Sequence, residues 1–186
     1  MSSENSHKRI LWITRTGILI ALLVVLQYVT SGTQAFAGQY ITGSCVNAVL
    51  ATAVLVAGLW SGVAVAIVSP FCARLLGIGP QVTAIVPAIA VGNLVFVLVL
   101  HFLVGRKAGA IWQKVLGLVI AAAAKFLTLF ILVVKVIVPM LSDALKPQQI
   151  TTFSVMFSYP QMITALIGGT LALAICPILK KALRQK

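Results

Sequence analysis

Acidic side chains are nearly missing from this sequence. Its 186 residues include two Asp or Glu against 14 Lys or Arg, and only 9% of the chain is charged. A soluble domain usually carries about a quarter charged residues, so most of this chain is expected to lie in lipid. The net charge of +12 would otherwise suggest nucleic-acid binding, but the apolar runs leave no room for a folded basic domain.

Cysteine is sparse, and catalytic motifs are missing. Cys45, Cys72 and Cys176 are odd in number and widely spaced, which supports neither a zinc site nor a disulfide framework. The sequence has no Walker motif, no paired carboxylate and no Ser/His/Asp constellation. We therefore expect a chain that is not an enzyme, has no catalytic residue, and holds no metal or cofactor of its own.

Long apolar runs are what the chain does have. They predict an all-α membrane protein, a six-transmembrane-helix bundle that forms one domain over residues 1–186. The expected helices are residues 10–30, 41–60, 63–76, 82–104, 112–138 and 161–179, with a tight turn at 61–62 and a long loop over 142–159. The third run is short for a span, so it is expected to be tilted, kinked or re-entrant.

The first apolar run has two interpretations. Ala35-Phe36-Ala37 has the small-x-small form of a signal-peptide cleavage site. Arg15 lies inside the run, however, and the run is long enough to span a bilayer at about 20 residues. We favour a retained first helix.

Basic residues are distributed unequally between the two sides of the predicted bundle. The side of the termini carries Lys8, Arg9, Arg15, Arg106, Lys107, Lys114, Lys180, Lys181, Arg184 and Lys186. The opposite side carries only Arg74 and Lys146. Because basic loops stay in the cytoplasm, both termini are predicted to be cytoplasmic.

Polar residues within the spans concentrate in the predicted outer half. Tyr28, Asn47, Arg74 and Gln81 all fall there. Polar side chains in lipid need partners, so this distribution predicts an outward-facing ligand pocket.

Two lysines in the fifth helix are the sharpest feature. At 100° per residue, Lys125, Thr128 and Lys135 fall on one face within about a quarter of the circumference. The chain's two acids lie outside the spans, Glu4 in the tail and Asp143 in a loop. Asp143 cannot pair with both lysines, so at least one must be solvated, hydrogen-bonded, deprotonated or bound to an anion.

The functional interpretation is that Arg74 and Lys135 hold an anionic group of a substrate, since Arg suits a carboxylate. The alternative is that both snorkel to the outer headgroups. Lys125 is too deep to snorkel easily, and its alternative role is packing against helix-break carbonyls. Asn47 contacts either the substrate or another helix, and a contact between helices is favoured for Asn93.

Several stretches resemble one family. They are Arg15-Thr-Gly-Ile-Leu-Ile-Ala-Leu-Leu, Leu59-Trp-Ser-Gly, Ser69-Pro-Phe, Leu76-Gly-Ile-Gly-Pro-Gln and Val86-Pro-Ala-Ile-Ala-Val-Gly-Asn. They resemble the substrate-binding S component of an energy-coupling factor (ECF) transporter, and the resemblance of the whole chain extends over nearly all six helices.

The resemblance implies a subunit of a bacterial plasma membrane that captures a water-soluble vitamin or related micronutrient outside the cell. Its expected partners are a transmembrane coupling subunit, the T component, and two cytoplasmic ATPases that use ATP. Toppling in the membrane would then deliver the substrate. In members of the family, small residues of the first helix contact the coupling subunit, and Gly17 and Ala21 are the matching positions in this chain. Their spacing also fits packing within the chain.

The basic bias suggests an anionic substrate, for example a pantothenate-like one. Two other classes remain open. A membrane-integral enzyme would need an acid, base or metal cluster, and an autonomous small secondary carrier usually needs intramembrane acids.

Overall fold

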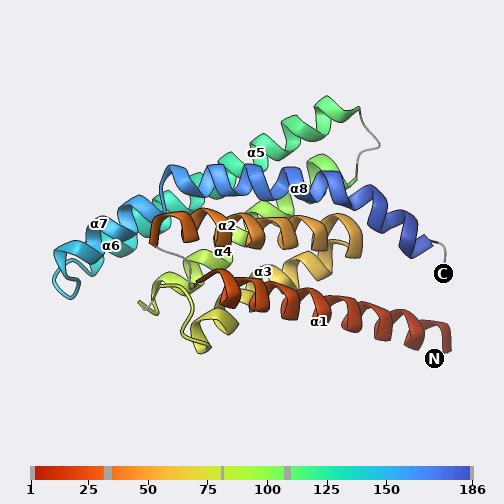
Figure 1. Ribbon diagram of the computed structural model, residues 1–186, viewed down its shortest axis with the longest axis horizontal. Helices are drawn as coiled ribbons and strands as arrows, with labels where there is room; N and C mark the ends of the chain where they lie inside the picture. The colour runs from red at the N-terminus through yellow and green to blue at the C-terminus, as the bar shows by residue number, and fades with distance from the viewer. Residues whose placement is uncertain (1–2, 32–34, 81, 107–109, 185–186) are drawn as a thin grey trace.

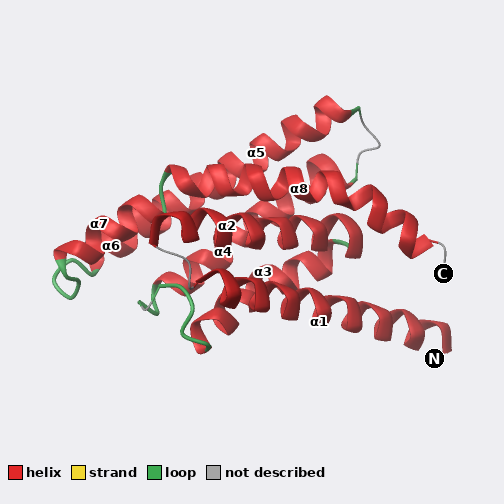
Figure 2. Ribbon diagram, in the orientation of Figure 1, coloured by secondary structure: helices red, strands yellow, loops and turns green. Residues whose placement is uncertain are grey.

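The computed structural model describes residues 3–31, 35–80, 82–106 and 110–184, and in those residues the chain forms helices without strands (Figure 2). The elements are α1 (Ser3–Ser31), α2 (Ala35–Thr52), η1 (Ala53–Ala57), α3 (Leu59–Leu75), α4 (Ile85–Leu100), η2 (His101–Gly105), α5 (Ile111–Leu129), η3 (Phe130–Ile137), α6 (Val138–Met140), α7 (Pro147–Met156) and α8 (Tyr159–Arg184). The three η segments are π-helical continuations of the helices that they follow.

The long helices close into a ring. α2 lies along α8, α8 packs on α5, α5 on α4, α4 on α3, α3 on α1, and α1 on α2 (Figure 1). Both chain ends lie at the same end of this bundle, and the α6–α7 connection lies at the other. We call these the terminal end and the distal end.

The described helices have the length and surface of membrane spans. Five of them are long and apolar enough to cross a bilayer, and α3, with 17 residues, is a shorter apolar helix. Large apolar side chains such as Ile18, Val25 and Ile175 stay exposed on the outside of the bundle, as expected where lipid covers them. The chain is therefore a multi-pass membrane protein.

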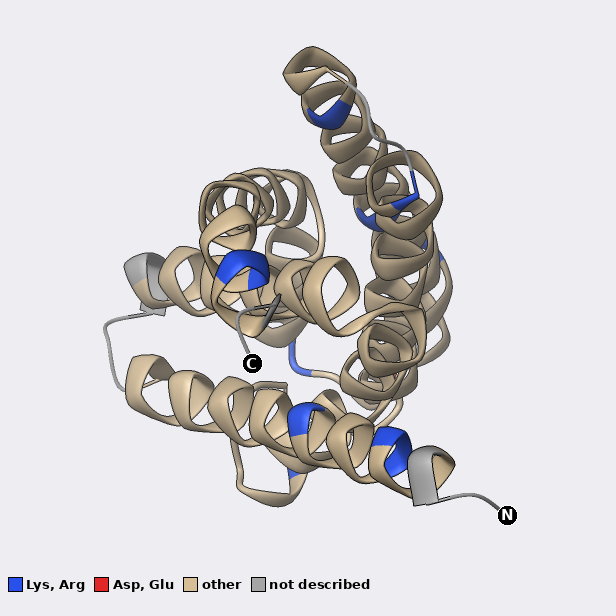
Figure 3. Cartoon of the chain, turned by 90° about the vertical axis from the view of Figure 1, so that its right-hand side faces the viewer, with Lys and Arg blue, Asp and Glu red and all other residues tan. Residues whose placement is uncertain are grey.

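Basic residues mark the terminal end. Seen from that end, Lys and Arg lie on the helices next to both chain termini (Figure 3). They include Lys8, Arg9 and Arg15 of α1 and Lys180 and Lys181 of α8.

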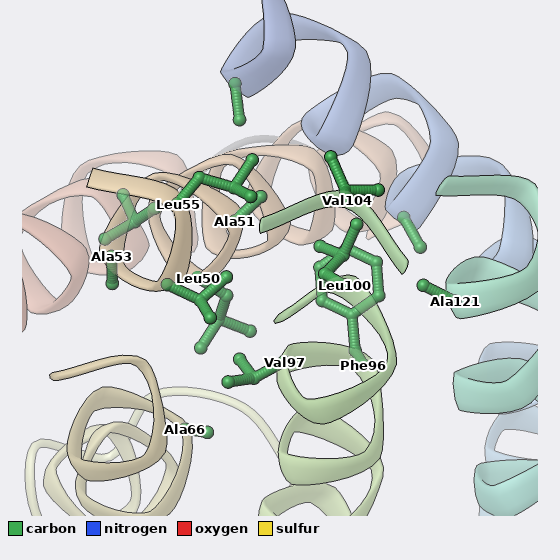
Figure 4. Packing of buried hydrophobic residues seen from close by; sticks show 14 of the residues in the cluster. Leu50, Ala51, Ala53, Leu55, Ala66, Phe96, Val97, Leu100, Val104 and Ala121 are labelled. Carbon is green, nitrogen blue, oxygen red and sulfur yellow. The ribbon is translucent and has the colours of Figure 1, made fainter. Parts of the chain in front are cut away.

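Two apolar clusters form the interior. The larger one takes residues from all six helices of the ring and from η1 and η2, and its side chains, such as Leu50, Phe96 and Leu100, point toward one another (Figure 4). The second, with Leu129, Val133 and Phe157 among its members, lies toward the distal end. Between the two clusters, α4 carries the buried polar residue Asn93 and α5 carries the buried Lys125.

The turn between the second and third helices comes earlier than predicted. The sequence indicated Ser61-Gly62, but the chain turns at Gly58, whose φ of 98° is open to glycine and strained for other residues. Ser61 is instead buried in α3, where it accepts a hydrogen bond from Thr16 Oγ1 at 2.9 Å. Gly62 faces Val54 and Val97, so it serves close packing.

The long loop predicted over 142–159 contains a helix. Pro147 begins α7 at a position where its missing N–H leaves no unmet donor. The Gln149 side chain accepts a hydrogen bond from the Lys146 backbone N–H at 3.0 Å, which caps this helix. Phe153 then packs into the distal apolar cluster.

Small residues let α2 and α8 approach closely. A β-carbon added at Gly168 would collide with the backbone of Ser44 and Ala48, and one at Gly43 would lie 2.9 Å from Thr164 Cγ2. Such contact between backbones is typical of helices that associate in lipid.

Gly168→Ala is expected to destabilise the protein, because the added methyl group has backbone rather than a flexible side chain against it. Overpacking of this kind costs about 1–3 kcal/mol, measurable as a lower midpoint of thermal unfolding in detergent. Gly17→Ala is the matched control, since a β-carbon there meets nothing within 4 Å. Equal midpoints for the two variants would contradict the tight α2–α8 contact.

Candidate functional site

A cavity of about 280 Å³ lies at the distal end of the bundle. Its walls come from the last turns of α1, the first turns of α2 and α8, the Ile78–Pro80 loop, the first half of α4 and the second half of α5. Each of these segments is the part of its element that faces away from the chain termini.

Lys125 is a buried polar residue that lines this cavity. The side chain is 3% exposed, and it crosses from α5 to two neighbouring helices. Its Nζ donates to Asn47 Oδ1 of α2 at 2.6 Å and to Asn93 Oδ1 of α4 at 2.7 Å. An ammonium group has three N–H donors, and no third acceptor is found among the described residues. A protonated Lys125 would thus keep one N–H for whatever occupies the cavity.

The orientation of Asn47 is fixed by its own neighbours. Asn47 Nδ2 donates to the Gly43 carbonyl at 2.8 Å and to Thr164 Oγ1 at 3.4 Å. The Thr164 hydroxyl in turn donates to the Gln161 carbonyl at 3.2 Å. With its amide nitrogen engaged on that side, Asn47 presents its oxygen to Lys125.

In the part of the chain that the structure describes, no acidic side chain lines the cavity beside Lys125. The Lys125 Nζ lies 5.5 Å from the centre of the Phe96 ring, a cation–π distance. Asp143 is exposed in the connection after α6, and Glu4 lies in the first turn of α1. Two amide dipoles and a ring face would stabilise an ammonium group at this position, and an anion in the cavity would add to them.

Gln27 of α1 contributes a second polar group. Its Oε1 is buried and has no hydrogen-bond partner among the residues that the structure describes. Gln27 lines both the main cavity and an adjacent hollow of about 60 Å³, which Arg74 also lines. Buried oxygens are rarely left without a donor, so Gln27 is suited to accept a hydrogen bond from a ligand.

Two glutamines bind the α7–α8 junction, which closes part of the cavity. The Nε2 groups of Gln39 and Gln161 each donate to the Met156 carbonyl at 3.0 Å. Met156 ends α7, and Phe157 follows it, 3% exposed. Both residues line the cavity, so the α7–α8 junction forms part of its roof.

The structure brings some of the predicted site residues together. Asn47 and Lys125 line the main cavity, and Arg74 lines the adjacent hollow. Tyr28 is 67% exposed, and Thr128 donates to the Ala124 carbonyl of its own helix. Neither is among the lining residues. Gln81 lies outside the described residues.

Lys135 does not lie beside Lys125. It is exposed, and its Nζ lies 5.5 Å from the centre of the Phe130 ring. The common face was derived with an α-helical step of 100°, but η3 begins at Phe130. A π-helix bonds i to i+5 and winds more residues into each turn, so the step no longer applies at Lys135.

Several lining residues were not predicted as site residues. Asn93 makes the contact between helices that the sequence favoured, and it lines the cavity as well. Gln161, Thr164 and Gly168 recur at helical spacing at the start of α8, a small polar face that indicates the packed side of that helix. Gln27 and Gln39 carried no comparable pattern.

Among the described residues, no group of three or more His, Cys, Asp or Glu side chains is placed to hold a metal ion. The cavity instead offers the amino group of Lys125 and an amide oxygen of Gln27. These groups suit reversible binding of a small polar molecule.

Comparison with known proteins agrees with this architecture. Residues 12–180 match the family model described as the substrate-specific component of the ECF transporter. The match covers most of the chain, so the chain belongs to this family, as the sequence resemblance indicated. Members of this family are substrate-binding subunits of transporters and not enzymes. No curated protein and no solved structure matches the chain.

Asn93→Ala is expected to destabilise the substrate-free protein, because Lys125 would keep a single amide acceptor. A hydrogen bond to a charged group contributes about 1.5–3 kcal/mol, readable from thermal unfolding in detergent. Thr128→Val is the control on the same helix as Lys125, since it removes a hydroxyl that bonds only within its own helix. An Asn93→Ala protein as stable as the control would show that the contact does not stabilise the fold.

Proposed function

We propose that this chain captures a small water-soluble vitamin or related micronutrient for an ATP-driven ECF uptake transporter, and that the substrate carries an anionic group. The observation that carries this proposal is the buried Lys125, which lines the cavity, has no acidic partner among the described residues and, when protonated, has one N–H to spare. A carboxylate bound there would supply the missing negative charge and accept that N–H.

The size of the cavity limits the substrate. Ligand pockets commonly measure about 300–1,000 Å³, and this one is about 280 Å³. A compact molecule of the pantothenate-like kind fits this range better than a large cofactor. Gln27 Oε1 would accept a hydrogen bond from a hydroxyl or amide of the same molecule.

The charge distribution supports binding from outside the cell. Basic residues gather at the terminal end, whereas the cavity lies at the distal end. If the basic end is cytoplasmic, as the positive-inside rule requires, the cavity faces the exterior. Release on the inner side then requires the subunit to reorient, and toppling within the bilayer accomplishes this.

The outer surface of α1 supports docking of a coupling subunit. Gly17 and Ala21 are both exposed, and a β-carbon at Gly17 would meet nothing within 4 Å. These small residues are therefore not used for packing within the chain. They leave a smooth strip on which a second helix can approach closely. We assign this strip to the T component, which joins two cytoplasmic ATPases that hydrolyse ATP.

Lys125→Met is expected to weaken substrate binding about ten- to a hundred-fold, the effect of losing a charge-assisted hydrogen bond. The measurement is equilibrium binding of a vitamin panel to purified protein, with each carboxylate paired with its uncharged amide or alcohol. Wild type should prefer the carboxylate, and the variant should lose that preference. Wild-type protein that is folded and binds no member of the panel would count against the proposal.

The matched control is Lys135→Met, the same substitution at an exposed position ten residues further along. Its affinity should equal that of wild type. A loss as large as that of Lys125→Met would instead bring Lys135 into the binding site, and the π-helical displacement would need revision.

Ala21→Leu is expected to weaken assembly with the coupling subunit while substrate affinity stays unchanged, because the bulky side chain blocks close helix approach. Co-purification of the tagged complex measures assembly, and the binding assay above measures affinity. Ala174→Leu, at an exposed position of α8, is the control. Unchanged assembly for both variants would exclude the α1 strip as the contact.

A further inference from the structure

A second cavity lies at the terminal end, remote from the substrate site. It measures about 470 Å³ and is bounded by η1, η2, the start of α5 and the second half of α8. Three basic residues line it, Arg106, Lys114 and Lys180, and each comes from a different segment. The remaining wall is apolar and includes Leu55 and Val104, which also pack in the larger apolar cluster (Figure 4).

The three cations face one hollow without a described acid to match them. Asp143 lies in the connection after α6, at the distal end, and Glu4 lies in α1, which does not line this cavity. The Arg106 guanidinium carbon lies 5.8 Å from the centre of the Phe102 ring, which holds it beside the hollow. Like charges that line one cavity repel one another, so an anion in the cavity would relieve that repulsion.

The surroundings of the cavity are those of a membrane interface. Ile111, which lines the cavity, is 71% exposed, and its neighbour Trp112 is 62% exposed. Ile178, next to the lining residue Pro177, is 70% exposed. Tryptophan beside basic residues is typical of the headgroup level of a bilayer. The hollow thus combines a cationic rim with apolar flanks that acyl chains would cover.

We propose that this cavity binds the phosphodiester headgroup of an anionic phospholipid from the leaflet at the terminal end. Arg106 offers the two-pronged donor geometry that suits phosphate oxygens, and Lys114 and Lys180 add positive charge. The apolar wall formed by Leu55, Val104 and Leu173 lies against the first carbons of the lipid. A zwitterionic lipid is held more weakly, because its own ammonium group meets three cations. The proposal is independent of the substrate that the distal cavity takes.

The test titrates purified protein with phosphatidylglycerol, phosphatidylcholine and inorganic phosphate and reads bound ligand by native mass spectrometry. The variant Arg106→Gln/Lys114→Gln/Lys180→Gln removes the three cavity charges. The control Arg9→Gln/Arg15→Gln/Lys181→Gln removes three charges from the same end outside the cavity. Wild type and control should bind phosphatidylglycerol, and the cavity variant should bind it about a hundred-fold more weakly than wild type, the combined effect of three charges. Wild type, the cavity variant and the control should all bind phosphatidylcholine weakly.

Four outcomes would overturn the proposal. Equal losses in the two triple variants would mean diffuse surface attraction. Inorganic phosphate bound as tightly as the lipid would mean a site for free anions. No phosphatidylglycerol bound to wild type would exclude the lipid, and a simultaneous loss of coupling-subunit assembly in the cavity variant would assign the charges to a protein contact. If the triple variant does not fold, the three single variants replace it, each expected to bind about five-fold more weakly, and unchanged binding in all three would refute the site.

Discussion

The contact of Lys125 with Asn47 and Asn93 is the constraint on which the rest of the structure depends. It ties α5 to α2 and α4 at one depth, between the two apolar clusters of the interior. A lysine in that position would be unfavourable in a packed apolar core, since a buried charge needs partners. The carboxamides make the charge tolerable, and the cavity above them keeps it accessible to a ligand.

The close approach of α2 and α8 serves the same contact. Because Gly168 has no side chain, the backbones of the two helices meet near Asn47. That proximity brings Thr164 within hydrogen-bond distance of the Asn47 amide nitrogen, which turns the amide oxygen toward Lys125. The close packing of α2 and α8 and the polar floor of the cavity therefore depend on each other. Small residues let the two helices approach, and the carboxamide of Asn47 supplies the polar group.

The sequence predicted the parts of this protein that periodicity and hydropathy control. Five of the predicted apolar runs correspond to helices long enough to cross a bilayer, the third corresponds to the shorter α3, and Lys125 faces inward as its α-helical position indicated. It did not predict features set by tertiary context. Gly58 and Gly62 lie in the same apolar stretch, so the sequence alone does not show at which of them the chain turns. The packing of the folded protein decides this. Nor does hydropathy show where η3 departs from α-helical winding, and Lys135 was misplaced for that reason.

The helices of the ring are not equally buried. In α1, 11% of the most apolar stretch is buried, against 33–44% in the other four long spans. Its inward face is little more than a stripe that includes Thr16 and Leu23. Gln27 and Ser31 on the same helix also line the distal cavity. An outward movement of α1 would therefore expose less buried surface than a movement of any of the other four long helices. It would open the cavity sideways, along the plane of the bilayer.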